Sequence, residues 1–314
     1  MTTTLERSTR GIRAERGRAG DRIFAGLARI SAIAILLAMV AVFLFLAAEG
    51  WSGLTASPTV FAPFTSFWSY LAPLVLSTAL CSGVALVLAV PCAIAIALFV
   101  SHYAPRRLAV ACAYVIDLLA AFPSVVFGLW GGRYLAGMLL PVHTWLHAHL
   151  GFVPLFGPPS PNGRSLFTAG VVLAIMILPI VTAISREVFA RTPRLNEEAA
   201  LALGATRWEM VRYAVLPHGR SGVVSGVMLG LGRALGETMA VAMVLAVTPT
   251  ATLDLIGTAS PATIAANVAL NFKESTPQRQ SLLIATGLVL FSITFAVNFA
   301  ARWVLGHSQV RSSR

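Results

Sequence analysis

Long apolar runs divide this chain into six segments, each long enough to cross a lipid bilayer. A spanning helix needs about 20 mainly apolar residues, because roughly 30 Å of hydrocarbon is crossed at a rise of about 1.5 Å per residue. No charged residue occurs between Glu49 and Arg106, or between Arg133 and Arg164. The pattern predicts an all-α membrane protein with six transmembrane helices at approximately residues 27–48, 73–101, 108–131, 166–185, 222–248 and 281–304.

Composition supports the membrane interpretation and excludes other classes. The 314 residues are 57% hydrophobic and 11% charged, whereas a soluble domain averages about 25% charged. Disordered, collagen-like and disulfide-rich classes do not fit these values. The three cysteines, Cys81, Cys92 and Cys112, fall inside predicted spans. Cys81 and Cys92 are about 16 Å apart on one helix, too far for a disulfide, so we expect small apolar fillers.

The net charge of +11 comes from 22 Arg and one Lys, and their positions predict orientation. Cytoplasmic flanks retain Arg and Lys. With the N-terminus inside, eighteen Arg are cytoplasmic and only Arg133, Arg164, Lys273 and Arg279 are external. Both termini are therefore predicted to be cytoplasmic, and the basic excess indicates topology rather than nucleic-acid binding. The Arg-rich tail is predicted to anchor the chain, with contact to anionic lipid as the alternative.

The chain lacks the residue patterns that catalysis would need. Its only lysine is Lys273, so no phosphate-binding G-x-x-x-x-G-K-[ST] loop occurs and this chain is not expected to hydrolyse ATP by that route. His143, His147 and His149 lie in a predicted external segment, where an amphipathic interfacial helix is favoured over a metal site. The sequence contains no recognisable serine hydrolase motif. We expect no enzyme activity, no metal and no cofactor in this chain.

The longest predicted cytoplasmic loop, residues 186–220, is predicted to form two short helices. Pro193 followed by Glu197 and Glu198 is typical of a helix start. Gly204 can end that helix by adopting a left-handed conformation. A second helix is predicted over 208–215, ending at Leu216-Pro217. The apolar side of this helix pair requires a partner.

The same loop carries the first resemblance to a known family. Glu198, Ala199 and Ala200, then Gly204 after three residues, then Leu216-Pro217 with the expected spacing, resemble the EAA loop of type I ABC importer permeases served by a binding protein. The departure is Ala214, where that family often has Ile. The resemblance implies a type I permease fold in which this loop forms coupling helices that dock on an ATPase subunit.

Two further stretches resemble the phosphate-specific (PstC) group of these permeases. They are residues 117–131, from Asp117 to Gly131, and residues 229–241, which contain Gly-Glu-Thr-Met-Ala-Val. Asp117 stands where that group is expected to have Glu. Over roughly residues 70–305, the resemblance implies import of inorganic phosphate. It also implies the partners of such an importer: a second permease resembling PstA, an ATPase dimer resembling PstB that binds ATP and Mg, and an external binding protein resembling PstS.

Ionisable residues inside the predicted spans are candidates for the translocation path. Arg233 lies about 20 Å beyond Arg220 along a helix, within the hydrocarbon. A charge there costs at least about 2.5–3.5 kcal/mol, which favours a functional role. Glu237 follows at i+4 and is expected to pair with Arg233. A guanidinium can fork two hydrogen bonds onto an oxyanion. Two alternatives remain open. Arg233 and Glu237 could form a purely structural pair, and Asp117 could make a structural hydrogen bond.

Small residues and prolines predict where helices pack or bend. Gly226 and Gly230 continue a repeat of four from Gly222, and Gly236 repeats Gly232. This spacing lets helix backbones approach closely, which favours packing over gating. Helix bends are expected at Pro91, Pro123 and Pro179.

The predicted organisation is therefore a cytoplasmic tail (1–26), a first transmembrane helix (27–48), a permease domain (70–305) containing the coupling loop, and a short cytoplasmic tail (306–314). The predicted function is alternating-access import of phosphate across the bacterial inner membrane. The alternatives are an ABC permease for sulfate, molybdate or phosphonate, or a secondary anion transporter, although no inverted repeat is found.

Overall fold

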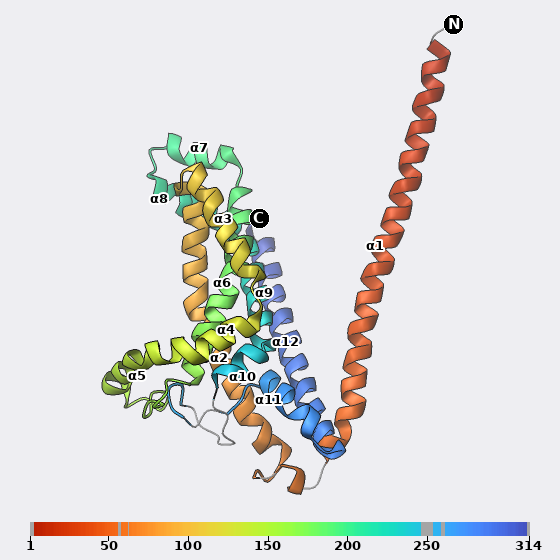
Figure 1. The fold of residues 1–314 in the computed structure, drawn as a ribbon. Helices are drawn as coiled ribbons and strands as arrows, with labels where there is room; N and C mark the ends of the chain where they lie inside the picture. The colour runs from red at the N-terminus through yellow and green to blue at the C-terminus, as the bar shows by residue number, and fades with distance from the viewer. Residues whose placement is uncertain (1–2, 56–57, 62, 246–253, 259–260, 313–314) are drawn as a thin grey trace. The chain divides into compact units, whose positions relative to one another are not determined.

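The computed structural model describes residues 3–55, 58–61, 63–245, 254–258 and 261–312, and these ranges contain helices and loops but no strand (Figure 1). The α-helices are α1 (Thr3–Leu54), α2 (Phe67–Leu98), α3 (Arg106–Ala121), α4 (Ser124–Trp130), α5 (Ala136–Leu150), α6 (Leu166–Ala190), α7 (Arg194–Ala202), α8 (Arg207–Met210), α9 (Leu216–Gly236), α10 (Met239–Val244), α11 (Ile264–Asn271) and α12 (Pro277–Ser312). The shorter turns are η1 (Pro58–Phe61), η2 (Phe99–Tyr103), η3 (Gly131–Leu135), η4 (Val211–Val215) and η5 (Phe272–Glu274), of which η2, η3 and η4 are π-helical.

The chain divides into two compact units, residues 1–49 and 50–314. The first consists of the greater part of α1, which runs from Thr3 to Leu54. The predicted boundary at residue 26 between tail and first span therefore falls inside one continuous helix.

Helices α2 and α6 form the centre of the second unit, and α9 packs on α6 (Figure 1). Ala85 and Ala89 of α2 and Leu173 and Ile177 of α6 are fully buried. Small side chains on α2 bring the two backbones close, and a Cβ at Gly170 of α6 would meet Val84 at 2.7 Å. This pair is the rigid frame against which the other elements are placed.

Five helical stretches among the described residues are long and apolar enough to cross a membrane. Four of them, Gly20–Leu54, Phe67–Tyr103, Leu166–Ala190 and Pro277–Trp303, contain or overlap predicted spans. The fifth, Ser124–Leu150, combines α4, η3 and α5 and was expected to be largely external. The predicted count of six spanning helices is not confirmed, because the two remaining predicted spans are interrupted.

The predicted span 108–131 is wrong as a single helix. Helix α3 ends at Ala121, and α4 begins at Ser124. Between them, Phe122 and Pro123 are extended, with ψ of 135° and 136°. Proline lacks an N–H and drives the preceding residue away from helical geometry, which explains the break.

The predicted span 222–248 is also interrupted. Helix α9 ends at Gly236, Glu237 is extended with ψ of 128°, and α10 starts at Met239. The last predicted residues, 246–248, lie outside the described ranges. Glu237 Oε1 accepts a hydrogen bond from the Ala240 N–H at 3.1 Å, so its carboxylate replaces a missing backbone acceptor at the start of α10.

The two broken helices meet, because α4 packs directly on α10. A Cβ at Gly128 would lie 2.6 Å from the Ala240 Cα, and one at Gly132 would lie 2.6 Å from the Met243 carbonyl oxygen. Residue numbers rise together along both helices, so α4 and α10 run parallel. Both breaks therefore lie at the same end of this contact.

The histidine segment folds as the helix α5, and its first histidine points inward. His143 is fully buried, with its ring edge-on to Phe167 at 5.6 Å. His147 Nδ1 is 3.0 Å from the Phe156 carbonyl oxygen, and His149 stacks on Trp145. Within the described residues, no group of three or more His, Cys, Asp or Glu is placed to hold a metal.

Candidate functional site

The first helix of the predicted coupling loop is α7, which starts at Arg194 after Pro193 and ends before Gly204. Gly204 has φ of +85°, as its sequence position predicts. Its N–H donates to the Leu201 carbonyl at 3.0 Å, and the Ala205 N–H donates to the Ala200 carbonyl at 3.2 Å. These two bonds form a Schellman motif, which stops α7 and reverses the chain.

The second helix starts with a capping box that sequence reasoning missed. The Glu209 N–H donates to Thr206 Oγ1 at 3.3 Å, while Glu209 Oε2 accepts from the Thr206 N–H at 2.8 Å. The backbone and hydroxyl donors of Thr206 lower the pKa of the Glu209 carboxyl. The signal was available, because Thr-x-x-Glu before a helix is the capping-box pattern.

The second helix does not end at Leu216-Pro217, and that prediction is wrong. Helix α8, the π-helical turn η4 and α9 follow one another without a gap from Arg207 to Gly236. The Leu216 N–H donates to the Val211 carbonyl, five residues back, and this wider turn makes room for the proline ring. The coupling loop is thus continuous with the helix that carries Arg233.

A cluster of buried side chains fixes this junction to the bundle. Val211 and Val215 of η4 pack with Phe189 of α6 and Leu98 of α2. Burying a side chain of this size contributes about 1.5–3 kcal/mol. Ala200 of the EAA triplet and Leu216 pack on the same cluster.

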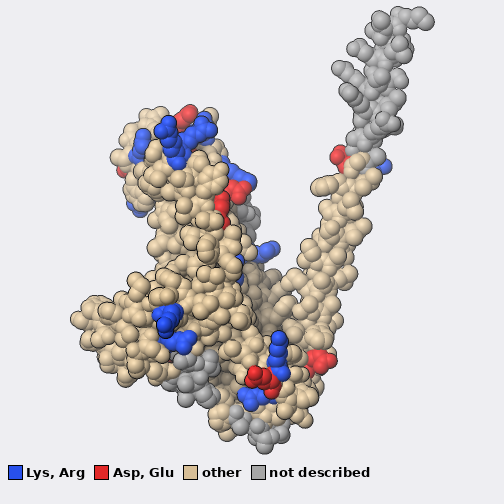
Figure 2. All heavy atoms as spheres, in the orientation of Figure 1, with Lys and Arg blue, Asp and Glu red and all other residues tan. Residues whose placement is uncertain are grey.

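The other side of the loop is open. Glu198, Ala199 and Pro217 are exposed, and large apolar side chains are exposed with them: Leu195 at 79% and Leu203 at 90%. Basic residues gather over α7 and α8 in Figure 2, and the exposed members are Arg191, Arg194, Arg207 and Arg212. An apolar surface rimmed by charge is typical of a protein interface.

A contact from α2 supports the loop and was not predicted. His102 Nε2 in η2 lies 3.4 Å from Glu197 Oε1 in α7, and its side chain is only 9% exposed. Ser101 Oγ lies 2.7 Å from His102 Nδ1 and completes the chain of contacts. The two partners are 95 residues apart, so no local pattern could have revealed them.

The three charged residues predicted inside the membrane do not form ion pairs with one another in the structure. Arg233 and Asp117 are exposed, and Glu237 is half-buried. The ion pairs among the described residues are His102 with Glu197 and Arg191 with Glu187. The predicted pairing of Arg233 with Glu237 is therefore wrong, because the helix ends at Gly236 and the i+4 relation no longer applies. Arg233 is exposed on this chain, about one helical turn before the break at the end of α9.

The glycines of α9 fall on two different faces. Cβ atoms at Gly222, Gly226 and Gly230 would meet Val188, Ile184 and Val181 of α6 at 2.3, 3.2 and 3.0 Å. Cβ atoms at Gly232 and Gly236 would meet nothing within 4 Å. The first row packs on α6, whereas the second faces open space.

The fold and these surfaces define a class of membrane protein. The chain is similar in fold to a solved bacterial ABC transporter involved in the import of the acidic polysaccharide alginate, with a TM-score of 0.55 at 18% identity over 90% of this chain and 99% of that chain. A second alginate ABC transporter, solved with its pentasaccharide-bound periplasmic protein, gives a TM-score of 0.56 at 17% identity over 85% and 91% of the two chains. The fold is that of an ABC importer permease.

The chain belongs to the binding-protein-dependent transport system inner membrane component family, whose model matches residues 89–306. It is 45% identical to "Phosphate transport system permease protein PstC 2" of Mycobacterium tuberculosis over 92% of this chain and 93% of that protein. It is 36% identical to "Phosphate transport system permease protein PstC" of Mesorhizobium japonicum over 98% and 96%. The chain is a multi-pass, non-catalytic permease component of the bacterial inner membrane.

Proposed function

We propose that this chain is a permease subunit of an ATP-driven phosphate importer. The observation that carries the proposal is its similarity, over nearly the whole chain, to relatives named as phosphate transport permeases. The Gly-Glu-Thr-Met-Ala-Val run supports the same substrate, and it covers the break between α9 and α10.

The coupling loop supports an ATPase partner. Its exposed Leu195 and Leu203 offer an apolar surface, while His102 and the buried η4 cluster hold the loop on the bundle. In this proposal a PstB-like ATPase dimer docks on α7 and binds the ATP and Mg. Movement of the loop is passed to α9, because α8, η4 and α9 are one helix.

The charges near the helix breaks support a translocation path shared with a second permease. Desolvating an anion costs tens of kcal/mol by idealised estimates, while one charge pair at 4 Å recovers only about 4 kcal/mol at an effective dielectric of 20. Arg233 alone cannot compensate for this cost. Because Arg233 and Asp117 are exposed on this chain, we expect a PstA-like permease to supply the further donors across the path.

The complete cycle is alternating access. A PstS-like binding protein delivers phosphate from outside, and ATP binding in the ATPase dimer reorients the two permeases. In this proposal both termini of this chain lie in the cytoplasm, as the distribution of arginines predicts. Gly236 and Pro123 then lie at the helix breaks where the path would open and close.

The test is uptake by the reconstituted complex of both permeases, the ATPase and the binding protein in proteoliposomes. Radiolabelled phosphate should accumulate only with internal ATP and external binding protein. Sulfate, molybdate and phosphonate at tenfold excess should not compete. Equal competition by one of these anions would reassign the substrate, and uptake without ATP would indicate a secondary transporter.

A further inference from the structure

A groove crosses α9 between α6 and α12. Its volume is about 690 Å³, within the range of small-molecule sites. Its lining residues are Ile180, Ser225, Met228, Leu229, Gly232, Arg233, Asn298, Ala301 and Arg302. The lining on α9 extends from Ser225 to Arg233, about 12 Å along the helix axis.

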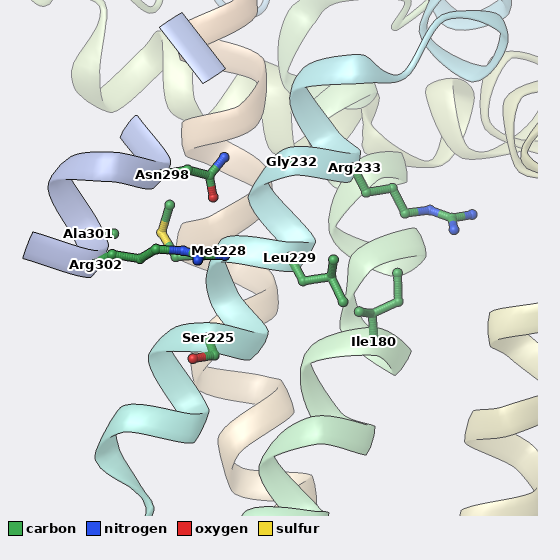
Figure 3. Close-up of a pocket in the computed structure, with 9 residues that line it drawn as sticks. All are labelled: Ile180, Ser225, Met228, Leu229, Gly232, Arg233, Asn298, Ala301 and Arg302. Atoms are coloured by element: carbon green, nitrogen blue, oxygen red, sulfur yellow. The ribbon is translucent and has the colours of Figure 1, made fainter. Parts of the chain in front are cut away.

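The groove has two cationic sides joined by an open floor. Figure 3 shows Arg233 and Ile180 on one side of α9, and Asn298 and Arg302 on the other, with the Arg302 guanidinium beside Met228. Gly232 lies between the two sides, and no atom lies within 4 Å of where its Cβ would be. The missing side chain keeps the groove continuous from one arginine to the other.

The groove carries two positive charges and no acidic lining residue. Neither Arg233 nor Arg302 takes part in the ion pairs recorded for the described residues. Arg302 belongs to α12 and lies at the predicted cytoplasmic end of the candidate membrane-spanning stretch Pro277–Trp303. The lining of the groove offers its guanidinium no carboxylate, and an oxyanion is the ligand that a forked guanidinium fits best.

The side chains beside Arg302 suit the same ligand. Asn298 lies one helical turn before Arg302 and therefore on the same face of α12. Its Nδ2 donates one hydrogen to the Thr294 carbonyl at 2.9 Å, which leaves a second N–H for a ligand. A forked guanidinium and an amide N–H together can bind three oxygens of a tetrahedral anion.

We propose that this groove binds a phosphoryl oxyanion, with Arg302 and Asn298 as its principal donors. Arg302 lies beside Met228, nearer to the coupling-loop end of α9 than Arg233. Resting on the proposed function, this position makes the groove a second station that receives phosphate from Arg233 on its way to the cytoplasm. The phosphate group of an anionic lipid has the same chemistry and is the other source.

The first measurement is equilibrium binding of radiolabelled inorganic phosphate to the detergent-solubilised permease–ATPase complex without binding protein. Arg302→Gln should weaken binding by about tenfold, the effect of losing one charge-assisted hydrogen bond. Arg302→Lys should retain an intermediate affinity, because it keeps the charge but loses the fork. Lys273→Gln, which removes a charge in the exposed segment η5, is the control and should bind as the wild type does.

The second measurement separates the two sources. Phosphate uptake is compared in vesicles of phosphatidylcholine alone and of phosphatidylcholine with phosphatidylglycerol. If phosphate in transit occupies the groove, Arg302→Gln should slow uptake by about tenfold in both membranes. If a lipid phosphate occupies it, phosphatidylglycerol should stimulate the wild type and not Arg302→Gln.

Wild-type behaviour of Arg302→Gln in both measurements overturns the groove proposal and leaves the proposed function intact. Absence of phosphate uptake by the wild-type complex overturns the proposed function instead. In that case the groove proposal is still tested by phosphate binding to the solubilised complex. Competition of that binding by the phosphatidylglycerol headgroup then shows which source of phosphate the groove binds.

Discussion

The two faces of α9 are built from the same kinds of residue and have opposite consequences. On one face, Gly222, Gly226 and Gly230 let α6 approach so closely that added Cβ atoms would press into its side chains. On the other, Gly232 leaves a floor that nothing covers, beside Arg233. Small residues therefore close one side of the helix and open the other. Substitutions on the first face should affect stability, and those on the second should affect transport.

The largest expected effect is at Arg233, which lines the same groove as Gly232. Arg233→Gln should reduce phosphate uptake by about a hundredfold, because loss of charge-assisted hydrogen bonds to the anion costs about 3 kcal/mol. Folding and assembly should be unchanged, since the side chain is exposed and outside the recorded ion pairs. Uptake assays with size-exclusion analysis of the complex measure both. Normal uptake by a well-assembled variant would remove Arg233 from the path.

The packed face should give the opposite result. A Cβ in Gly222→Ala would lie 2.3 Å from the Val188 Cγ2, and such overpacking costs about 1–3 kcal/mol. Gly232→Ala adds the same methyl group to the same helix without a clash and gains helix propensity worth up to about 1 kcal/mol. The Tm of the complex should fall for the first variant and not for the second. Equal Tm values would contradict the assignment of the two faces.

The connection between the coupling loop and α9 gives a third test. Gly204→Val forces a β-branched residue into φ of +85°, a conformation that costs roughly 1–2 kcal/mol even for Ala. The turn after α7 should distort, and more ATP should be hydrolysed for each phosphate imported. The ratio of ATPase rate to uptake rate measures this. An unchanged ratio would show that α9 can move without an intact Gly204 turn.

The His102 contact with Glu197 should have a smaller effect on the same ratio. His102→Gln loses a contact at 3.4 Å that is largely shielded from solvent, and we expect about a twofold rise in ATP hydrolysed per phosphate, as for an interaction of about 0.5 kcal/mol. Glu187→Gln is the matched control, because it breaks the exposed pair with Arg191 and should leave the ratio unchanged. Identical ratios for both variants would make the contact incidental.

The smallest expected effect is a pH dependence at the start of α8. Hydrogen bonds from Thr206 lower the folded pKa of Glu209, so their stabilisation is present above the unfolded carboxyl pKa and is lost as pH falls through the lowered value. The amide-exchange protection factors of α8, which correct for the intrinsic effect of pH on exchange, should fall as the pH drops through the lowered pKa of Glu209. Glu209→Gln should remove this dependence, and a wild-type profile in that variant would contradict the role of the carboxylate.

Sequence patterns predicted the parts of the fold that depend on local chemistry. Hydropathy predicted four of the five long apolar helices, and the Gly204 cap followed from a helix-stop signal. The break at Pro123 was readable from the proline rule, but the apolar run around it concealed it. The break at Glu237 has no proline, and it is accompanied by a carboxylate cap on Ala240 that appears only in three dimensions.

The sequence identified the residues of the candidate site, but not how they are arranged in space. Arg233, Glu237 and Asp117 stood out because charges are rare in apolar segments. Their relation did not follow from spacing, since i+4 pairing holds only where a helix continues. Arg302 and Asn298 come from α12, some 65 to 70 residues further along the chain. Only the packing of α12 beside α9 brings them to the same groove as Arg233.

The unbroken helix from Arg207 to Gly236 gives the molecule a mechanical lever. Thirty residues at 1.5 Å each make a rod about 45 Å long. If the rod rotates by about 10° about η4, which lies about 35 Å from Gly236, the far tip swings by about 6 Å, roughly one helical turn. The η4 turn, clamped between α2 and α6, lies where such a rod would pivot. A short stroke at the coupling-loop end would thereby become a displacement of about one helical turn near Arg233.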